Sequence, residues 1–149
     1  MRYLALAADY DGTLATNGLV DGPTVAGLRE LLASGRSLIL VTGRELDELL
    51  AYFPEITLCE RVVAENGALL YYPETREENA LGVAPPASFV TALRARGVPL
   101  SVGRSIVPTV HPHETTALEV IPDLGVELQV VFNQGSVVVT KSFGASSFQ

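Results

Sequence analysis

Two aspartates separated by a single residue are the side chains near the start of the chain best suited to chemistry. Asp9 and Asp11 follow an apolar run over residues 3–8, which predicts a buried strand ending where they begin. Residues two apart project to the same side of an extended segment, so the two carboxylates would lie together. Their mutual repulsion favours a cation between them. Oxygen ligands with open positions suit Mg²⁺ and a phosphate oxygen.

These residue types predict a role for each position of the loop. Asp9 is a candidate nucleophile because a carboxylate can form an aspartyl-phosphate. Asp11 is a candidate general acid that protonates the leaving oxygen and later activates water. Gly12 lets the backbone turn close to a phosphate, and Thr13 offers a hydroxyl and an N–H group. The simpler interpretation of Asp11-Gly12 is a β-turn, which does not explain a second aspartate directly after a buried strand.

A second polar loop follows the next apolar run, at residues 37–41. The hydroxyl of Thr42, together with Gly43 and the N–H groups that open the following helix, is predicted to bind phosphate oxygens. The alternative is that Thr42 is a helix cap, for which threonine is well suited. Arg44 either reaches the phosphate or only pairs with Glu48 one helical turn later, and the surface pair is slightly favoured.

The first eighty residues alternate between strand-like and helix-like patterns, which predicts an α/β fold with a parallel sheet and right-handed crossovers. Open parallel sheets place ligands at the carboxyl ends of their strands, where Asp9 and Thr42 are expected. The expected strands are residues 3–8, 37–41 and 61–64, with helices starting at Asp21-Gly22-Pro23 and covering residues 46–53.

A change of character near residue 80 predicts a second module. Asn66-Gly67 lies between two apolar runs and predicts a hairpin. Residues 73–86 are polar and rich in turn formers, and beyond them helical and strand-like patterns alternate again. We expect a core at residues 1–80, an α/β module at 81–141 and a flexible tail at 142–149. The second module is expected to hold helices at 88–96 and 114–121, a β-prone stretch at 100–110 and a hairpin at 127–140 with its turn at 133–135.

Composition excludes several classes of protein. Hydrophobic residues make up 48% of the 149 residues and charged residues 18%, which favours a folded chain over a disordered one. The net charge of −7 and the absence of a basic run disfavour nucleic-acid binding. Cys59 is the only cysteine, which fits a reducing cytoplasm. The apolar start is too short for a signal peptide or a membrane span, so we expect a cytoplasmic protein without a membrane partner.

Three short motifs resemble those of the haloacid dehalogenase (HAD) superfamily, and in particular its Cof-like phosphatase branch. They are Asp9-Tyr10-Asp11-Gly12-Thr13-Leu14, Leu40-Val41-Thr42-Gly43-Arg44 and Ala64-Glu65-Asn66-Gly67-Ala68. Members of that branch are Mg²⁺-dependent phosphatases of sugar phosphates and other small phosphoesters.

The resemblance implies Asp9 as nucleophile and metal ligand, Asp11 as general acid and base, and the main-chain carbonyl of Asp11 as a second metal ligand. It also implies Thr42 as a phosphate-binding hydroxyl, with Asn66 and Gly67 lining the pocket. The implied fold is a partial Rossmann-like core with an inserted α/β cap, which shields a small phosphorylated metabolite from water and selects it.

The chain departs from the family pattern in its second half. The family also uses a lysine that opens a helix after the cap and an acidic Gly-Asp-x-x-x-Asp-type loop. No Gly-Asp pair occurs after Thr42, and the only aspartate after Asp47 is Asp123, inside the expected cap. Lys141 is the only lysine and a possible substitute for the missing cation, although no helix is expected after it.

These observations lead to one main hypothesis and two alternatives. The main one is a Mg²⁺-dependent phosphoester hydrolase that is weak or inactive in a truncated chain and is completed by a homo-oligomer or an additional chain or domain. Its third strand would then expose an unpaired edge or a bare apolar face. The first alternative is a non-catalytic binding or oligomerisation module. The second is a response-regulator-like phosphoacceptor, which the Asp-Gly-Thr sequence fits poorly. In the cap, Arg104, His111 and His113 are possible substrate contacts, although solvated surface is the simpler interpretation.

Overall fold

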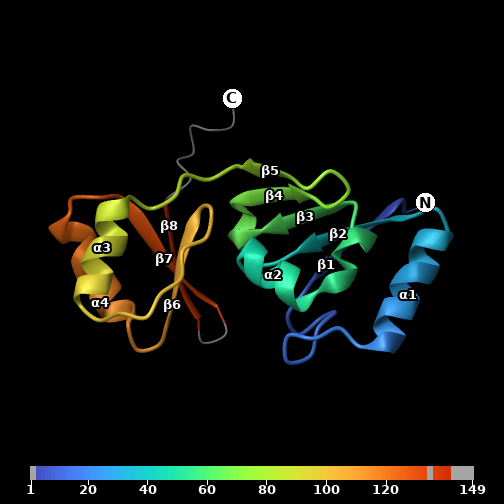
Figure 1. Ribbon diagram of the computed structural model, residues 1–149, viewed down its shortest axis with the longest axis horizontal. Coiled ribbons are helices and arrows are strands. Elements are labelled where there is room, and N and C mark those ends of the chain that lie inside the picture. The colour runs from blue at the N-terminus through green and yellow to red at the C-terminus, as the bar shows by residue number, and fades with distance from the viewer. Residues whose placement is uncertain (1–2, 134–135, 142–149) are drawn as a thin grey trace. The chain divides into compact units, whose positions relative to one another are not determined.

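The computed structural model describes residues 3–133 and 136–141 of the 149. The chain divides into two compact units, residues 1–81 and 82–149, each described here by itself (Figure 1). The sequence placed this boundary one residue earlier. The expected tail at 142–149 and the centre of the last hairpin turn lie outside the described residues.

The first unit contains a five-stranded sheet in the order β1-β2-β3-β4-β5. Its first three strands are parallel, and β4 and β5 continue the sheet in antiparallel fashion. The carboxyl ends of the three parallel strands therefore meet at one edge of the sheet, as the α/β prediction requires. The bounds are β1 (Ala5–Asp9), β2 (Ser37–Val41), β3 (Arg61–Ala64), β4 (Leu69–Tyr72) and β5 (Glu77–Ala80).

The helices of this unit begin and end where the sequence provides caps. In α1 (Gly22–Ala33), the carboxylate of Asp21 accepts the Thr24 N–H at 2.8 Å, and Pro23 lies in the first turn. Gly35 follows the helix with φ +79°, a conformation that favours glycine. α2 (Leu46–Tyr52) ends before Pro54, which starts the 3₁₀ helix η1 (Pro54–Leu58). No helix of the described residues is long and apolar enough to cross a membrane.

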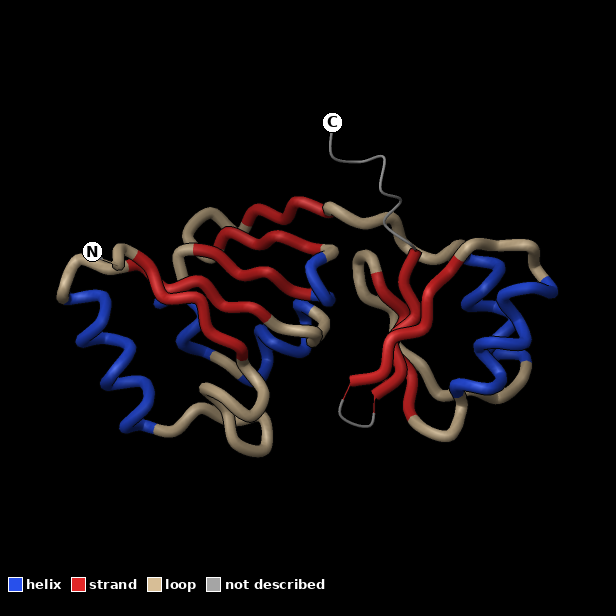
Figure 2. Tube along the Cα trace, turned by 180° about the vertical axis from the view of Figure 1, so that it is seen from behind, coloured by secondary structure: helices blue, strands red, loops and turns tan. Residues whose placement is uncertain are grey.

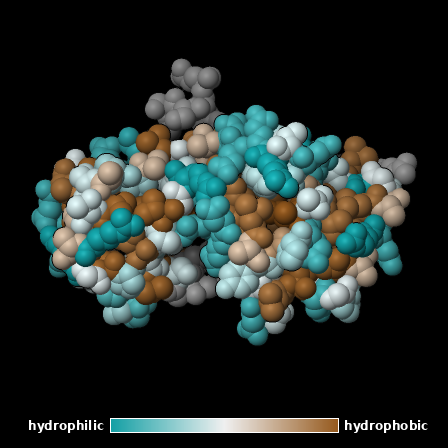
Figure 3. Space-filling model, in the orientation of Figure 1, coloured by the Kyte–Doolittle hydropathy of each residue, from teal (hydrophilic) through white to brown (hydrophobic). Residues whose placement is uncertain are grey.

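The core of the first unit lies on the face of the sheet that carries these helices (Figures 1 and 2). Leu38 and Leu40 of β2 and Val62 of β3 are fully buried there, while Ile39 and Val41 on the opposite face are not. Figure 3 shows apolar patches among the hydrophilic residues of the surface it views. Large apolar side chains that remain exposed in this unit include Tyr3, Leu4, Leu6, Leu19, Val41, Leu50 and Tyr52.

Two expectations about the first unit are corrected. The expected free edge at the third strand is wrong, because β3 pairs with β2 on one side and β4 on the other. The two edge strands among the described residues are β1, which pairs only with β2, and β5, which pairs only with β4. The sequence also missed β5, which forms where a polar boundary was expected because its backbone pairs with that of β4 from Tyr72 to Leu69.

The second unit packs two helices against a three-stranded antiparallel sheet in the order β6-β8-β7. Pro108 lies in the edge strand β6, the position expected for a residue without an N–H group. α4 ends at Asp123, one residue after Pro122, whereas the expected end was residue 121. The elements are α3 (Ala87–Ala95), β6 (Ile106–Val110), α4 (Glu114–Asp123), β7 (Leu128–Asn133) and β8 (Ser136–Lys141).

The fully buried Leu40 gives a direct test of the first unit's core. We expect Leu40→Ala to lower the free energy of unfolding by about 2–5 kcal/mol, because truncation removes buried methyl groups and leaves a cavity. Urea denaturation followed by circular dichroism measures the change. The matched control is Leu19→Ala, whose side chain is 60% exposed and should change stability by no more than about 0.5 kcal/mol. Equal effects of the two substitutions would contradict this packing.

Candidate active site

The residue between the two aspartates fixes the first loop to the core. Strand alternation turns Tyr10 inward while Asp9 remains exposed and Asp11 half-buried. The Tyr10 ring is fully buried with its centroid 5.7 Å from that of Phe53, and its hydroxyl donates to the Gly18 carbonyl at 2.9 Å. Burial raises the pKa of the Tyr10 hydroxyl, so it remains a donor. Tyr10 thereby positions the carboxylates on either side of it.

The loop after Tyr10 is a compact, hydrogen-bonded turn. The Tyr10 carbonyl accepts the N–H groups of Leu14 and Ala15 at 3.1 and 2.8 Å, and Gly12 N–H donates to the Ala15 carbonyl at 2.9 Å. Gly12 has φ +76°, which explains the glycine. Thr13 is exposed at the tip of the turn. The β-turn interpretation is therefore correct for this segment, and the functional interpretation stays a prediction.

The second loop lies next to the first because β1 and β2 pair in register. Asp9 is the partner of Val41, and the Tyr10 N–H donates to the Val41 carbonyl at 3.2 Å. Thr42 is only 3% exposed, and its hydroxyl oxygen accepts the Arg44 N–H at 3.1 Å. The helix that follows begins at Leu46 with Glu45 as its N-cap. Thr42 is therefore not the helix cap, and the expected row of helical N–H groups does not begin beside it.

Arg44 joins the second loop to the first. Its Nε and Nη2 atoms donate to the two carboxylate oxygens of Asp11 at 2.7 and 2.8 Å, the two-pronged geometry that favours arginine. Its Nη1 atom donates to Glu48 at 2.6 Å, so the predicted helix-surface pair is present, but it is not the main contact. The hydrogen bond to Asp11 is also the largest cause of a raised pKa for Arg44.

The third loop is held against the second by the backbone. Glu65 N–H donates to the Arg44 carbonyl at 3.0 Å, and Asn66 N–H donates to the Thr42 carbonyl at 3.3 Å. Glu65 and Asn66 have φ +53° and +56°, within a short 3₁₀ turn that connects β3 to the antiparallel β4. The Asn-Gly signal therefore correctly marked a hairpin. The sequence did not single out Glu65, which is fully buried beside this turn and whose positive φ had no sequence signal.

The structure brings most of the predicted site residues to one edge of one sheet. Those at the carboxyl ends of β1, β2 and β3 are Asp9, Asp11, Thr13, Thr42, Gly43, Arg44, Asn66 and Gly67. Lys141, the possible substitute cation, is instead the last residue of β8 in the second unit. Arg104, His111 and His113 also belong to the second unit, where the His111 ring lies 2.7 Å from the Glu114 carboxylate.

The donor atoms at this edge match Mg²⁺ in kind but are few. Asp9 presents an exposed carboxylate, and both carboxylate oxygens of Asp11 are engaged by Arg44. No cluster of three or more His, Cys, Asp or Glu side chains that could hold a metal occurs in residues 3–133 and 136–141. Mg²⁺ often binds through one or two carboxylates together with waters and substrate phosphate. The Asp9 carboxylate and the Asp11 main-chain carbonyl would suit that mode.

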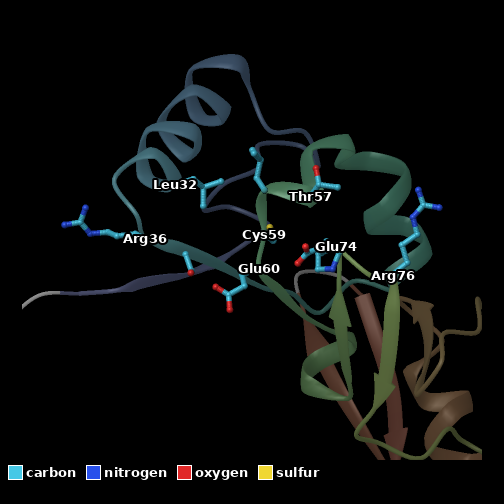
Figure 4. Close-up of a pocket in the computed structure, with 10 residues that line it drawn as sticks. Leu32, Arg36, Thr57, Cys59, Glu60, Glu74 and Arg76 are labelled. Carbon is cyan, nitrogen blue, oxygen red and sulfur yellow. The ribbon is translucent and has the colours of Figure 1, made fainter.

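A separate hollow of about 630 Å³ lies at the amino-terminal end of β2, away from the carboxyl ends that carry the candidate site (Figure 4). Its lining combines Arg36, Glu60, Glu74 and Arg76 with the buried Cys59. In Figure 4 the side chains of Arg36 and Arg76 point away from one another and from Cys59. Burial raises the pKa of the Cys59 thiol to about 12, so the thiol stays protonated. The Cys59 thiol is therefore a poor nucleophile at neutral pH.

The fold and the site define an α/β protein with a Rossmann-like core, whose polar loops gather at the carboxyl ends of its first three strands. The sequence profile of the haloacid dehalogenase-like hydrolase family matches residues 6–92, more than half of the chain, and the protein belongs to this family. No curated protein sequence matches the chain.

Solved structures show the same fold at low sequence identity. A haloacid dehalogenase-like hydrolase from Bacteroides thetaiotaomicron is 13% identical with a TM-score of 0.74, over 96% of this chain and 72% of its own. A HAD subclass IIB sugar phosphatase is 16% identical with a TM-score of 0.63, over 93% and 70%. A HAD/COF-like hydrolase from Plasmodium vivax is 15% identical with a TM-score of 0.69, over 93% and 68%. The chain thus spans about 70% of the length of these structures.

A double-mutant cycle tests the link between the first two loops. For Arg44→Gln and Asp11→Asn we expect a coupling energy of about 1 kcal/mol, since the side chains are 20% and 33% exposed and solvent screens the pair. The coupling should fall in 1 M salt, where the screening length is about 3 Å. Urea denaturation of the four proteins measures it. The same cycle on Arg61 and Glu60, an exposed pair 3.9 Å apart, should give coupling near zero. Equal coupling for both pairs would contradict the assignment.

The raised pKa of Cys59 predicts slow thiol chemistry in the folded protein. We expect a disulfide-exchange reagent at pH 8 to label Cys59 slowly when the protein is folded and quickly in urea, because the reactive species is the thiolate. The folded pKa lies above that of the unfolded chain. Burial of the thiol therefore stabilises the fold fully below about pH 9, and this contribution is lost as pH rises towards 12. Cys59→Ala gives the labelling background. Rapid labelling of the folded protein at pH 8 would show that the thiol is accessible.

Proposed function

We propose that this chain carries the nucleophile half of a phosphoester hydrolase that acts on a small phosphorylated metabolite. The observation that best supports the proposal is the placement of Asp9. Its carboxylate is exposed at the carboxyl end of β1, directly beside the Thr42 loop, while its neighbour Tyr10 is locked into the core. A fixed backbone with a free carboxylate is what an attacking group requires.

In the proposed reaction, a carboxylate oxygen of Asp9 bonds to phosphorus while the ester P–O bond breaks, and the leaving oxygen keeps that electron pair. Water then attacks phosphorus in the aspartyl-phosphate. The water gives its proton to a base, inorganic phosphate leaves and the Asp9 carboxylate is restored. Mg²⁺ bound by Asp9 and the Asp11 carbonyl would supply positive charge next to the phosphoryl oxygens.

The pairing with Arg44 shapes what Asp11 can do in this reaction. The guanidinium of Arg44 donates to both carboxylate oxygens of Asp11, so the carboxylate is held as a hydrogen-bond acceptor. A carboxylate held as an acceptor is placed to take a proton from water in the second step, but it is poorly placed to give one to the leaving group in the first. The chain is therefore best suited to phosphoesters whose leaving oxygen is weakly basic, such as aryl phosphates.

The second unit is the proposed cap. Its α/β composition fits a module that shields the phosphoester from water and selects the substrate. The buried face of its sheet is covered by α3 and α4, which are tied together by Arg96 with Asp123 at 2.9 Å and Glu119 at 3.5 Å. Substrate contacts by Arg104, His111 and His113 remain part of the proposal.

The second candidate function is a non-catalytic binding or assembly module. It is favoured by the full engagement of the Asp11 carboxylate and by the small number of metal donors in the described part of the chain. In this case the loops bind phosphate or metal without turnover. The two functions make opposite predictions for a single assay.

Hydrolysis of p-nitrophenyl phosphate with Mg²⁺ is the decisive assay. We expect slow turnover by the wild-type chain. Asp9→Asn should abolish it, because the amide cannot attack phosphorus, and chelation of the metal should abolish it as well. Asp11→Asn should lower the rate on the aryl ester by about 10²-fold, because the amide cannot accept a proton from the water of the second step.

Asp21→Asn is the matched control, since Asp21 caps α1 outside the site and asparagine is an equally good cap. It should retain the wild-type rate. Turnover that survives Asp9→Asn would rule out Asp9 as the nucleophile. No turnover at any Mg²⁺ concentration would reject the enzyme and leave the binding module.

A further inference from the structure

Aromatic rings as well as carboxylates surround the guanidinium of Arg44. Two of its nitrogen atoms donate to Asp11 and the third donates to Glu48. Its central carbon also lies over two aromatic rings, 5.5 Å from the centroid of Tyr10 and 5.6 Å from that of Tyr52. A cation within about 6 Å of a ring centroid is attracted by the negative charge on the face of the ring. The group that holds Asp11 is therefore itself held by two tyrosines.

Tyr52 is the one of these two tyrosines that is open to the solvent. Tyr10 is fully buried, and its hydroxyl donates to the carbonyl of Gly18, where an added Cβ would lie 3.1 Å from Nη2 of Arg44. Tyr10 and Gly18 thus belong to the packed interior of the first loop. Tyr52 is 49% exposed at the last position of α2. Its ring can be replaced with little loss of core packing, so its effect on Arg44 can be measured separately.

The spacing of residues on α2 explains how Tyr52 reaches Arg44. Residues four apart lie on the same face of a helix, one turn from each other. Glu48 and Tyr52 have this spacing, and Arg44 precedes Glu48 by the same interval. Leu46 and Leu49 are buried in the core of the unit. The outer row of α2 thus brings a carboxylate and an aromatic ring to one guanidinium.

We propose that Tyr52 is a positioning residue for Asp11 and acts through Arg44. The proposal rests on the function proposed above, in which the Asp11 carboxylate takes a proton from water in the second step. The ring limits the movement of the guanidinium, whose two-pronged bond in turn limits the movement of the carboxylate. A base must lie within hydrogen-bond reach of the water that it activates. Loss of the ring should therefore slow the second step and leave substrate binding and the first step unchanged.

Three variants separate the ring from the space that it fills. Tyr52→Phe keeps the face of the ring, whereas Tyr52→Leu keeps an apolar side chain without it. The matched control is Tyr72→Leu, which removes a ring 4.5 Å from the guanidinium of Arg61, an arginine outside the candidate site. A general effect of tyrosine packing predicts the same result for Tyr52→Leu and Tyr72→Leu. Circular dichroism establishes that each variant is folded. If Tyr52→Leu is not, Tyr52→Gln takes its place, because it also lacks the ring.

Exchange of the Arg44 Nε proton with water, followed by NMR, reports the hydrogen bond to Asp11 without any need for turnover. The signal is assigned by its loss in Arg44→Gln. We expect exchange to be about two- to fivefold faster in Tyr52→Leu, the range that an exposed cation–π contact supports. Tyr52→Phe and Tyr72→Leu should exchange at the wild-type rate.

Hydrolysis of p-nitrophenyl phosphate with Mg²⁺ tests whether the position of Asp11 matters for the chemistry. The leaving group of this ester departs readily, so we expect the second step to limit kcat. Tyr52→Leu should lower kcat about two- to fivefold and lower KM by the same factor, so that kcat/KM, which reports the first step, stays constant. In Arg44→Gln, the addition of Tyr52→Leu should have no further effect, because the ring acts only through the guanidinium.

The outcomes distinguish this proposal from the proposed function. Unchanged exchange in folded Tyr52→Leu overturns it, and so does an equal increase in Tyr52→Phe or Tyr72→Leu. In a chain that turns over, an unchanged kcat, or a fall in kcat that persists in Arg44→Gln, also overturns it. Faster exchange in Tyr52→Leu alone, in a chain without turnover, rejects the proposed function but supports Tyr52 as the residue that positions Asp11.

Discussion

The parallel, in-register pairing of β1 with β2 is the constraint on which the candidate site depends. It sets Asp9 beside Val41, and the Tyr10 N–H extends the ladder one residue further to the Val41 carbonyl. The first and second polar loops therefore leave the sheet side by side. Burial of Tyr10 then fixes the side from which each aspartate projects. Without this register, the two carboxylates and the Thr42 loop would not lie side by side at the carboxyl ends of the strands.

Arg44 adds side-chain contacts to the backbone pairing that holds the first two loops together. Arg44 spans from the second loop to Asp11 in the first, and continues to Glu48 on α2. It also lies 5.5 Å from the Tyr10 ring and 5.6 Å from the Tyr52 ring, so its position is set by packing as well as by charge. The two carboxylates therefore differ: Asp9 is exposed, and Asp11 is paired with the Arg44 guanidinium. Two residues of the same type thus have different surroundings, which is what the separate roles proposed for them require.

The sequence predicted those features that depend on local pattern. Strands 37–41 and 61–64 have the expected bounds, since continuous apolar runs between turn formers specify them. β5 could not be predicted, because Glu77, Glu78 and Asn79 are poor strand formers that become extended only by pairing with β4. The Arg44–Asp11 pair joins residues 33 positions apart. The helical i,i+4 spacing predicted the pair of Arg44 with Glu48. The spacing of residues along a helix cannot predict a contact between residues that only the tertiary fold brings together.

The free edge was predicted on the wrong strand for a related reason. The sequence gives strand order along the chain, but not which strand lies at the margin of the sheet, and the antiparallel return of β4 and β5 encloses β3. Among the described strands, β1 and β5 are consequently the margins of the sheet, and β1 is the strand that ends in the candidate nucleophile Asp9. The candidate nucleophile Asp9 therefore lies at the end of a strand that pairs on one side only among the described strands, because β4 and β5 extend the sheet beyond β3 and not beyond β1.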